Sequence, residues 1–192
     1  MKNPMKRIKI DGDPGKHWFT SDTHFGHANI LRYCERPWPG IIEHDQALVE
    51  NWNSVVSPGD TVWHLGDFCF GGSDRWSRLF ERLNGDIRLV LGNHDASASE
   101  SMLANGPTEV YPGIARLWFQ ADSQEIWLSH FPLATWPGAW GGRSWNLHGH
   151  VHSRELPLDA RPGQYDVGVD LNGYRPVCYT ELARLVPTGE GQ

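Results

Sequence analysis

The sequence predicts an α/β fold in which two β-sheets pack together and are flanked by helices. In the first half, short apolar segments that end in polar turns alternate with segments of helical apolar spacing. This strand–helix alternation is typical of α/β proteins with crossover helices. In the second half, strand-like segments follow one another with few helical signals. An α/β half followed by a β-rich half suits two packed sheets with helices outside them.

The expected elements of the first half alternate in type along the chain. Strands are expected at residues 17–20, 61–65 and 87–91, and helices at 26–35, at 41–56 and from Ser73 to a stop at Asn84-Gly85. The helix over 41–56 has apolar side chains at helical spacing and is stopped by Ser57-Pro58-Gly59. In the following helix Trp76, Leu79 and Leu83 share one face, and Ser73 is a candidate N-cap.

The second half is expected to be mostly strands, at residues 115–121, 125–129, 145–148 and 165–169, with a closing helix at 179–186. The stretch 131–145 is rich in Pro, Gly and Trp and is expected to be a loop. The chain of 192 residues has the size of one domain, and no repeat or linker divides it. We expect a flexible N-terminal tail over residues 1–15 and a single domain over residues 16–192.

Composition narrows the class of partner and the compartment. The formal net charge is −6, which gives no overall basic field for a long nucleic acid. The three cysteines are far apart and not in C-x-x-C spacing, so neither a disulfide framework nor a thiolate zinc site is expected. No apolar run reaches membrane-spanning length, and residues 1–20 lack the apolar core of a signal peptide. We therefore expect a cytoplasmic protein without a membrane partner; its oligomeric state is left open.

Five short polar segments lie at or just after the ends of predicted strands: Asp22-Thr23-His24, Gly66-Asp67, Gly92-Asn93-His94-Asp95, Ser129-His130 and Gly149-His150-Val151-His152. Strand ends along one edge of a sheet are where α/β proteins build their sites. In an extended backbone, the side chains of residues i and i+2 point to the same side. The side chains of Asp22 and His24 can therefore converge on one point, and so can those of His150 and His152. Glycines at these turns allow close backbone approach. The mixture of carboxylate, amide and imidazole suits Mn²⁺, Fe or Zn²⁺ better than a lone Mg²⁺.

The five segments together resemble the calcineurin-like metallophosphoesterase family, whose pattern is D-x-H, G-D, G-N-H-D/E, a lone H and G-H-x-H. All five blocks occur in that order between residues 22 and 152, and the stretches 22–27 and 62–68 look like the small bacterial and phage-type members. The resemblance implies a four-layer αββα fold. It also implies a hydrolase that cuts phosphomonoester or phosphodiester bonds with a hydroxide that bridges two metal ions.

The resemblance assigns seven ligands to two divalent ions, with Mn²⁺ favoured and Fe, Zn²⁺ or Mg²⁺ as alternatives. Three would bind each ion and one would be shared: Asp22, His24 and His152 on the first ion, Asn93, His130 and His150 on the second, and Asp67 between them. His94 would be a catalytic residue that faces the phosphate. Asp95 is a second catalytic candidate, which would either orient His94 or cap the next helix, and both readings stay open.

The expected substrate is small and phosphorylated or nucleotide-like, and a small open site favours phosphodiesterase activity. By motif, His27 is a candidate substrate contact, and Arg143 is a candidate phosphate clamp because a guanidinium matches phosphate oxygens. Two further histidines, His64 and His148, are candidates for the core or for support of a ligand. Trp136 and Trp140 either pack their loop or stack on a base, and Asp166 and Asp170 are interpreted as turn residues. The alternative function is a non-catalytic scaffold, against which the presence of His94 argues.

Overall fold

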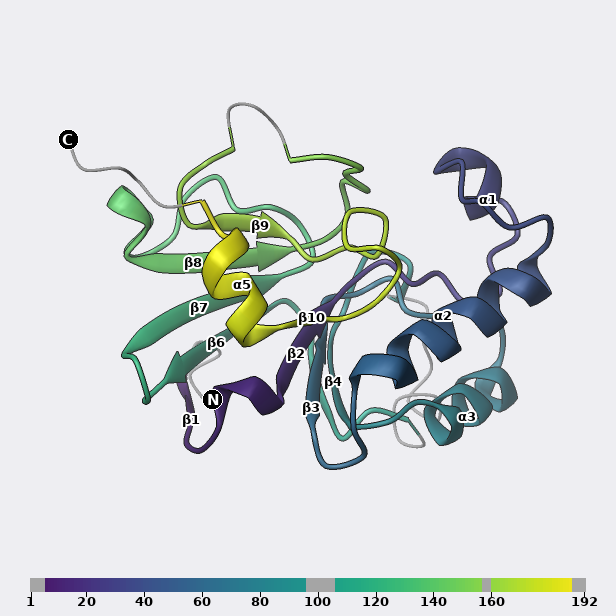
Figure 1. Cartoon of the computed structure of the whole chain (residues 1–192), viewed down its shortest axis with the longest axis horizontal. Helices are drawn as coiled ribbons and strands as arrows, with labels where there is room; N and C mark the ends of the chain where they lie inside the picture. The colour runs from purple at the N-terminus through teal and green to yellow at the C-terminus, as the bar shows by residue number, and fades with distance from the viewer. Residues whose placement is uncertain (1–5, 96–105, 157–159, 188–192) are drawn as a thin grey trace.

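The computed structural model describes residues 6–95, 106–156 and 160–187, and it contains two five-stranded sheets that pack face to face (Figure 1). The first sheet has the order β10 (Val177–Cys178), β2 (His17–Thr20), β3 (Thr61–His64), β4 (Asp86–Val90) and β5 (Glu109–Tyr111). Its strands β2 to β5 run parallel, and β10 is antiparallel to β2.

The second sheet has the order β1 (Ile8–Ile10), β6 (Ile114–Phe119), β7 (Gln124–Ser129), β8 (Ser144–His148) and β9 (Gln164–Asp166). Only the β6–β7 pair of this sheet is antiparallel. The helices are α1 (Ile30–Tyr33), α2 (Ile41–Val55), α3 (Ser73–Arg82) and α5 (Tyr179–Leu185), with short 3-10 turns η1 (Pro14–Lys16) and η3 (Trp140–Gly142). The predicted fold class, two packed sheets flanked by helices, is confirmed.

The first sheet is buried on both faces because its strands alternate between two apolar cores. In β3, the side chain of Val62 joins the core under α2 and α3, and that of Trp63 joins the core between the sheets. Helix α2 contributes Leu48 and Trp52 to the former core, whereas Leu117 of β6 belongs to the latter. Within the described part of the chain, no helix has the length and apolarity needed to cross a membrane.

Several short elements differ from the expected ones. Residues 8–10 form β1, parallel to β6, so part of the predicted N-terminal tail belongs to the second sheet; residues 1–5 lie outside the described residues. A strand of three residues has too few positions to show an alternating pattern, and the same holds for β5 and β10. The expected helix at 26–35 is reduced to α1, and α3 begins at Ser73 with Gly72 as its N-cap.

The loops that follow the parallel strands are bonded to one another across the two sheets. The backbone N–H of Asp22 donates to Gly66 O at 3.0 Å, and that of His24 donates to Asp67 O at 3.0 Å. On the side of the second sheet, Gly149 N donates to His130 O at 3.0 Å. Between the sheets, Val169 N donates to Ser21 O at 3.1 Å and His150 N donates to Asp22 Oδ2 at 2.9 Å. The carboxyl ends of β2, β3, β7 and β8 therefore meet in one place.

Candidate metal centre

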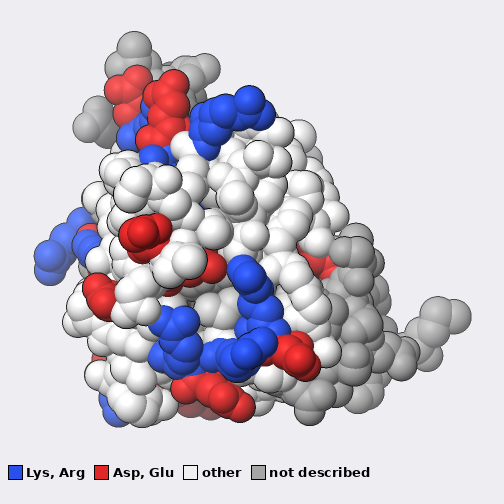
Figure 2. Space-filling view, turned by 90° about the vertical axis from the view of Figure 1, so that its right-hand side faces the viewer, with Lys and Arg blue, Asp and Glu red and all other residues white. Residues whose placement is uncertain are grey.

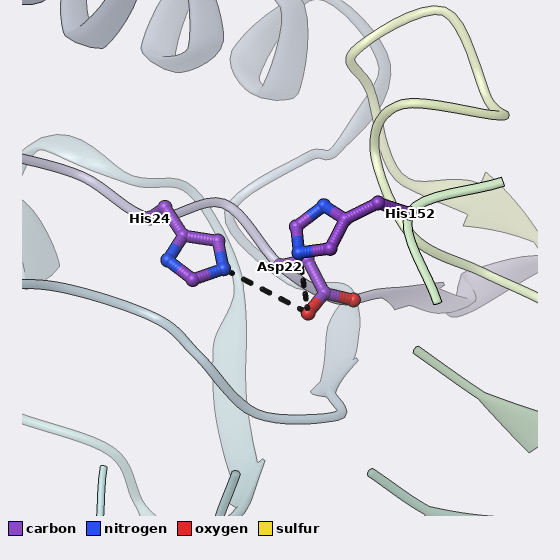
Figure 3. Close-up of side chains that lie close together, drawn as sticks. All are labelled: Asp22, His24 and His152. Carbon is purple, nitrogen blue, oxygen red and sulfur yellow. Dashed lines mark ion pairs between the residues drawn. The ribbon is translucent and has the colours of Figure 1, made fainter. Parts of the chain in front are cut away.

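Three of the predicted ligands meet at the end of β2 (Figure 3). The Nε2 atoms of His24 and His152 lie 3.9 and 3.8 Å from Asp22 Oδ1. Asp22 and His24 come from the loop after β2, whereas His152 comes from the loop after β8. The backbone N–H of His150 in that second loop donates to Asp22 Oδ2 at 2.9 Å, although the two residues are 128 positions apart. The three donor atoms form a group of the size that one metal ion needs.

A second group of predicted ligands lies on the other side of Asp67. Oδ2 of Asp67 is 3.6 Å from His24 Nε2 and 3.5 Å from His130 Nε2, so one carboxylate oxygen faces both groups. Asn93 Oδ1 lies 2.9 Å from His130 Nε2 and 3.1 Å from His150 Nδ1. The structure therefore brings all seven predicted ligands together, with Asp67 between two sets of three.

These residues fit divalent metal ions on two grounds. First, Asp22 Oδ1 and His24 Nε2 are buried and have no hydrogen-bond partner among the described residues. Buried polar atoms are nearly always paired, because leaving one unpaired is costly. Second, ligand bonds of about 2.1 Å put two donors on one ion at most about 4 Å apart. The separations around Asp22 and Asp67, from 3.5 to 3.9 Å, lie within that limit.

The backbone at the ligands adopts a conformation that the sequence did not reveal. Eight non-glycine residues of the described chain have positive φ, and five of them are predicted ligands: Asp22, His24, Asp67, His150 and His152, with φ between 50° and 73°. This left-handed region is unfavourable for residues that have a side chain, and the residues that adopt it tend to cluster at functional sites. The side chains of residues i and i+2 do converge, but the predicted cause, an extended backbone, was wrong. Left-handed turns direct these side chains toward the centre.

The glycines of the polar segments allow the loops to touch. A Cβ at position 66 would lie 2.5 Å from Gly92 N and 2.7 Å from His130 Nδ1, and φ of Gly66 is +97°. A Cβ at position 92 would lie 2.6 Å from Asp67 N. Any side chain at either position would push the loops that carry Asp67 and His130 apart.

The sequence interpretation missed a buried network behind His152. Asp170, which was interpreted as a turn residue, accepts a hydrogen bond from His152 Nδ1 at 2.7 Å and pairs with Arg36 at 2.8 Å. Arg36 also donates to the backbone oxygens of Asp22 and Thr23, at 2.7 and 3.0 Å. Since Nδ1 of His152 is engaged by Asp170, its Nε2 is left to face the group around Asp22. No local motif marks either partner, because Arg36 and Asp170 are 134 residues apart.

Hydrogen bonding and burial set the charge of the ligands in the protein without metal. Nδ1 of His130 lies 2.8 Å from Leu65 O, so this nitrogen carries a proton, and Nε2 faces Asp67. Burial lowers the pKa of His24 to about 2 and raises that of Asp22 to about 7. Burial would also raise the pKa of Asp67, but hydrogen bonds from His130 and the His94 backbone outweigh it and lower the value to about 2. His24 is thus neutral and Asp67 anionic.

Asp95 holds two of the loops together. Its Oδ2 accepts hydrogen bonds from the backbone N–H groups of Asp67 and Gly92, at 2.7 and 2.9 Å, and its Oδ1 accepts one from Phe68 at 3.0 Å. The carboxylate is buried, at 2% exposure. We therefore correct the prediction that Asp95 is a catalytic residue: its oxygens are used by backbone donors, and it positions the loop that carries Asp67.

His94 lies over the centre and is open to solvent. Its Nε2 is 3.9 Å from Asp67 Oδ2, and its side chain is 46% exposed against 2% for Asp67. The rings of His24 and Phe70 lie 5.5 and 5.0 Å from it. His27, the predicted substrate contact, stacks on Phe70 at 4.1 Å and lies 6.2 Å from His94, so it borders the same opening.

Arg143 is not at the centre, which corrects its prediction as a phosphate clamp. It directly precedes β8, whereas the ligands His150 and His152 follow the other end of that strand. Five residues of strand separate the two ends by about 16 Å. The sequence places Arg143 in a loop but does not show at which end of the sheet the loop lies. In the same loop, Trp136 is buried, whereas Trp140 is 87% exposed.

Three other histidines support the surrounding loops. His64 is buried and bonds Thr23 Oγ1 at 2.9 Å through Nε2, which matches its predicted core or supporting place. His148 is buried and has Nδ1 3.0 Å from Gly149 O. His44, which carried no sequence signal, lies 2.9 Å from Arg36 Nη1 and so belongs to the network behind His152.

Comparison with known proteins gives one family. A family model described as calcineurin-like phosphoesterase matches residues 15–173. The gene 66 protein of Mycobacterium phage D29 is 36% identical over 80% of this chain and 87% of its own length, and that of Mycobacterium phage L5 is 30% identical over 88% and 93%. An uncharacterized protein of Methanocaldococcus jannaschii is 29% identical over 91% of this chain and 93% of its own.

A solved structure has the same fold. A protein of unknown function from Aquifex aeolicus superimposes with a TM-score of 0.71 and 28% sequence identity, and the match covers 88% of this chain and 98% of the other. The matched family region includes all five polar segments, from residue 22 to residue 152.

Proposed function

This chain belongs to the calcineurin-like phosphoesterase family, a family of metal-dependent phosphoesterases, and on that premise we propose that it hydrolyses phosphodiesters at a centre of two divalent metal ions. The proposed first ion is held by Asp22, His24 and His152, the second by Asn93, His130 and His150, and both by Asp67. Mn²⁺ is the proposed native ion, because the ligand set mixes oxygen and nitrogen donors.

One observation carries the proposal: Oδ2 of Asp67 lies within 3.6 Å of donors on both sides. A carboxylate that faces two sets of donor atoms can be shared by two divalent ions. When bound, the ions would supply an activated water near neutral pH and would neutralise phosphate charge. The two carboxylates of Asp22 and Asp67 leave such a pair with a net positive charge, which favours an anionic substrate in a protein of net charge −6.

The chain's own groups supply orientation and a proton. The pair of Asp170 and His152 fixes the His152 ring, and Leu65 O fixes that of His130, so that in both rings Nε2 faces inward. His94 is exposed to an incoming phosphate, with Nε2 3.9 Å from Asp67 Oδ2. We assign to His94 the stabilisation of charge on the phosphate or the transfer of a proton to the leaving oxygen.

The preference for a diester rests on the openness of the centre. His94, Asn93 and His150 are all exposed, so both ester substituents of a phosphate have room outside the ligand set. The proposed substrate class is a small phosphorylated or nucleotide-like molecule.

The test measures hydrolysis of bis(p-nitrophenyl) phosphate and of p-nitrophenyl phosphate with Mn²⁺, Zn²⁺ or Mg²⁺, with and without chelator. We expect faster cleavage of the diester, loss of activity with chelator and recovery with Mn²⁺. His94→Ala is expected to lose activity while it keeps two ions per chain by metal analysis. A matched control is His17→Ala, a half-buried histidine that packs on Phe119 away from the centre.

Two outcomes would overturn the proposal in different ways. A wild-type protein that binds two ions but hydrolyses neither ester with any metal would favour the non-catalytic scaffold. A protein that binds one ion per chain would contradict the shared role of Asp67.

A further inference from the structure

A groove lined by arginines lies beside the centre, between α2 and α3. Three arginines of α3 line it, Arg75, Arg78 and Arg82, together with Asp45 and Gln46 of α2, and its volume is about 410 Å³. Positions 75, 78 and 82 follow helical spacing, so the three side chains share one face of α3. Figure 2 shows Lys and Arg side chains gathered around a hollow on the side of the molecule where α2 and α3 lie.

The positive charge of this groove is largely uncompensated. Arg75 lies 3.6 Å from Asp45 and is 46% exposed. Within the described ranges, no carboxylate lies at ion-pair distance from Arg78 or Arg82; Arg82 instead donates to Gln46 at 2.6 Å. Arg75, Arg78 and Arg82 are exposed, and their guanidinium forks match phosphate oxygens.

The groove is continuous with the rim of the metal centre. Both oxygens of Asp45 accept hydrogen bonds from the backbone N–H of Gly26, at 3.1 and 3.0 Å, and Arg75 packs against the same glycine. Gly26 directly precedes His27, which borders the opening over His94. Because Gly26 is only two residues from His24, the groove begins within about 7 Å of the backbone of a proposed ligand.

An exposed aromatic ring lies close to His27. Tyr33 of α1 is 62% exposed, and its ring centroid is 6.3 Å from that of His27. The guanidinium of Arg32 lies 5.1 Å from the same ring. Aromatic faces next to a positively charged groove are the features by which proteins bind single-stranded nucleic acid.

We propose that this groove binds the phosphates of a short single-stranded oligonucleotide whose scissile phosphodiester lies at the metal centre. From Arg75 to Arg82 the helix rises about 10 Å. At about 3.4 Å per nucleotide of a helical strand, the row corresponds to about three phosphates. The row together with the exposed ring of Tyr33 favours an oligonucleotide over a polyphosphate, which has no base to stack on that ring. The inference rests on the proposed phosphodiesterase function and agrees with the expectation that no long nucleic acid binds.

The test compares one variant on two substrates. The variant is the double substitution Arg78→Ala with Arg82→Ala, which leaves Arg75 and its contact with Asp45 intact. The substrates are bis(p-nitrophenyl) phosphate and end-labelled single-stranded DNA or RNA of about ten nucleotides. We expect unchanged kinetics on the small diester and a rise of about tenfold or more in KM for the oligonucleotide. The slope of log KM against log salt should fall by about 1.4, since each contact with a single strand contributes about 0.7.

The matched control is Lys16→Ala with Arg184→Ala, which removes the same charge from exposed positions at η1 and α5. This control is expected to leave both substrates unaffected. If the α3 variant cleaves the oligonucleotide with wild-type KM and salt slope, the inference is overturned while the phosphodiesterase proposal stands. The inference would also be overturned if the α3 variant lost as much activity on ATP or tripolyphosphate as on the oligonucleotide, because the groove would then bind a polyphosphate.

A wild-type protein that cleaves neither substrate would refute the proposed function instead. In that case fluorescence anisotropy of the labelled oligonucleotide with Mn²⁺ present decides the inference. Weaker binding by the α3 variant than by the control supports the groove as a nucleic-acid site, and equal binding refutes it.

Discussion

The two halves of the candidate centre hold the same number of ligands but differ in how firmly they are held. In the closed half, formed by Asp22, His24 and His152, the side chains of Asp22 and His24 are 0% and 2% exposed. In the open half, formed by Asn93, His130 and His150, only His130 is buried, and the other two are exposed. Equal ligand counts therefore do not imply equal preorganisation.

The difference extends to the supports behind the ligands. In the closed half, His152 is held by Asp170, which is held by Arg36, which in turn binds the backbone of Asp22. In the open half, Leu65 O holds His130, but within the described residues the side chains of Asn93 and His150 hydrogen-bond only to ligands of their own half. Fixed ligand geometry raises metal affinity. We therefore expect the closed half to bind its ion more tightly than the open half.

The largest expected effect comes from Asp67→Asn, which removes the charge shared by both halves. We expect kcat/KM for bis(p-nitrophenyl) phosphate to fall about 10⁴-fold, equivalent to about 5 kcal/mol of lost stabilisation. Metal analysis should show that the open half loses its ion first. The matched control is Asp11→Asn, an exposed aspartate that pairs with Lys9. Two ions bound with near-normal activity would show that Asp67 does not join the halves.

His94→Ala should lower kcat about 10²- to 10³-fold while both ions stay bound. The residue lies over both halves but is outside the ligand set, with Nε2 3.9 Å from Asp67 Oδ2. If His94 donates a proton, the loss should be larger for an alkyl phosphodiester than for one that releases p-nitrophenol, because a good leaving group needs less help. An equal loss for both leaving groups would favour charge stabilisation by His94 over proton transfer.

How far the sequence predicts this centre depends on the range of each interaction. The ligands could be predicted as candidates because each lies in a short polar segment at the end of a strand, and strand ends can be recognised from the local sequence. Arg36 and Asp170 could not, because their role arises from packing between segments 134 residues apart. The positive φ of Asp22 and His24 was likewise hidden, since residues other than glycine give no sign of it.

The errors in the fold have the same origin. The longer elements with apolar periodicity, such as α2 and β6, were predicted close to their observed bounds. Strand β1 was missed because three residues carry almost no periodicity. Arg143 was placed at the centre because a loop's composition does not show at which end of the sheet it lies. Local sequence patterns thus predicted the helices and strands. Which residues lie at the centre and which lie at the opposite edge of the sheet is known only from the arrangement of these elements in space.

Removal of metal should destabilise the protein, mostly through the closed half. A ligand present at 100 times its Kd stabilises the folded state by about 2.7 kcal/mol. For a chain of 192 residues this corresponds to a fall in Tm of about 5 to 10 °C with excess chelator. Titration of Mn²⁺ into the chelated protein should restore most of that shift at the first equivalent. Equal increments for the first and second equivalents would remove the proposed difference between the halves.

Asp170→Asn tests the support of the closed half directly. We expect the affinity for one of the two ions to fall about 10- to 100-fold and the other to change little, as is usual for a partner behind a metal-binding histidine. Calorimetric titration of Mn²⁺ measures both affinities in one experiment. Asp86→Asn, which removes a carboxylate paired with Arg88 on β4, is the control for loss of a charge. A comparable weakening of both sites would mean that Asp170 acts on the fold and not on one half.

The smallest expected effects come from two aromatic rings, one beside each half. Phe70 lies 5.7 Å from His24, 4.1 Å from His27 and 5.0 Å from His94 by ring centroids. Phe131 lies 4.4 Å from His150 and is 50% exposed. Aromatic pairs contribute about 0.5 to 1.5 kcal/mol each, so their loss lowers activity by about two- to tenfold.

Phe70→Ala should reach the upper end of that range, because the ring packs against three histidines around the closed half. Phe131→Ala should stay near twofold, because half of its ring already faces solvent and its loss leaves no buried gap. Steady-state kinetics on bis(p-nitrophenyl) phosphate measure both variants under the same conditions. A larger loss for Phe131→Ala would mean that the substrate stacks on this ring, and the openness of that half would then be a substrate-binding feature instead of weaker support for the metal.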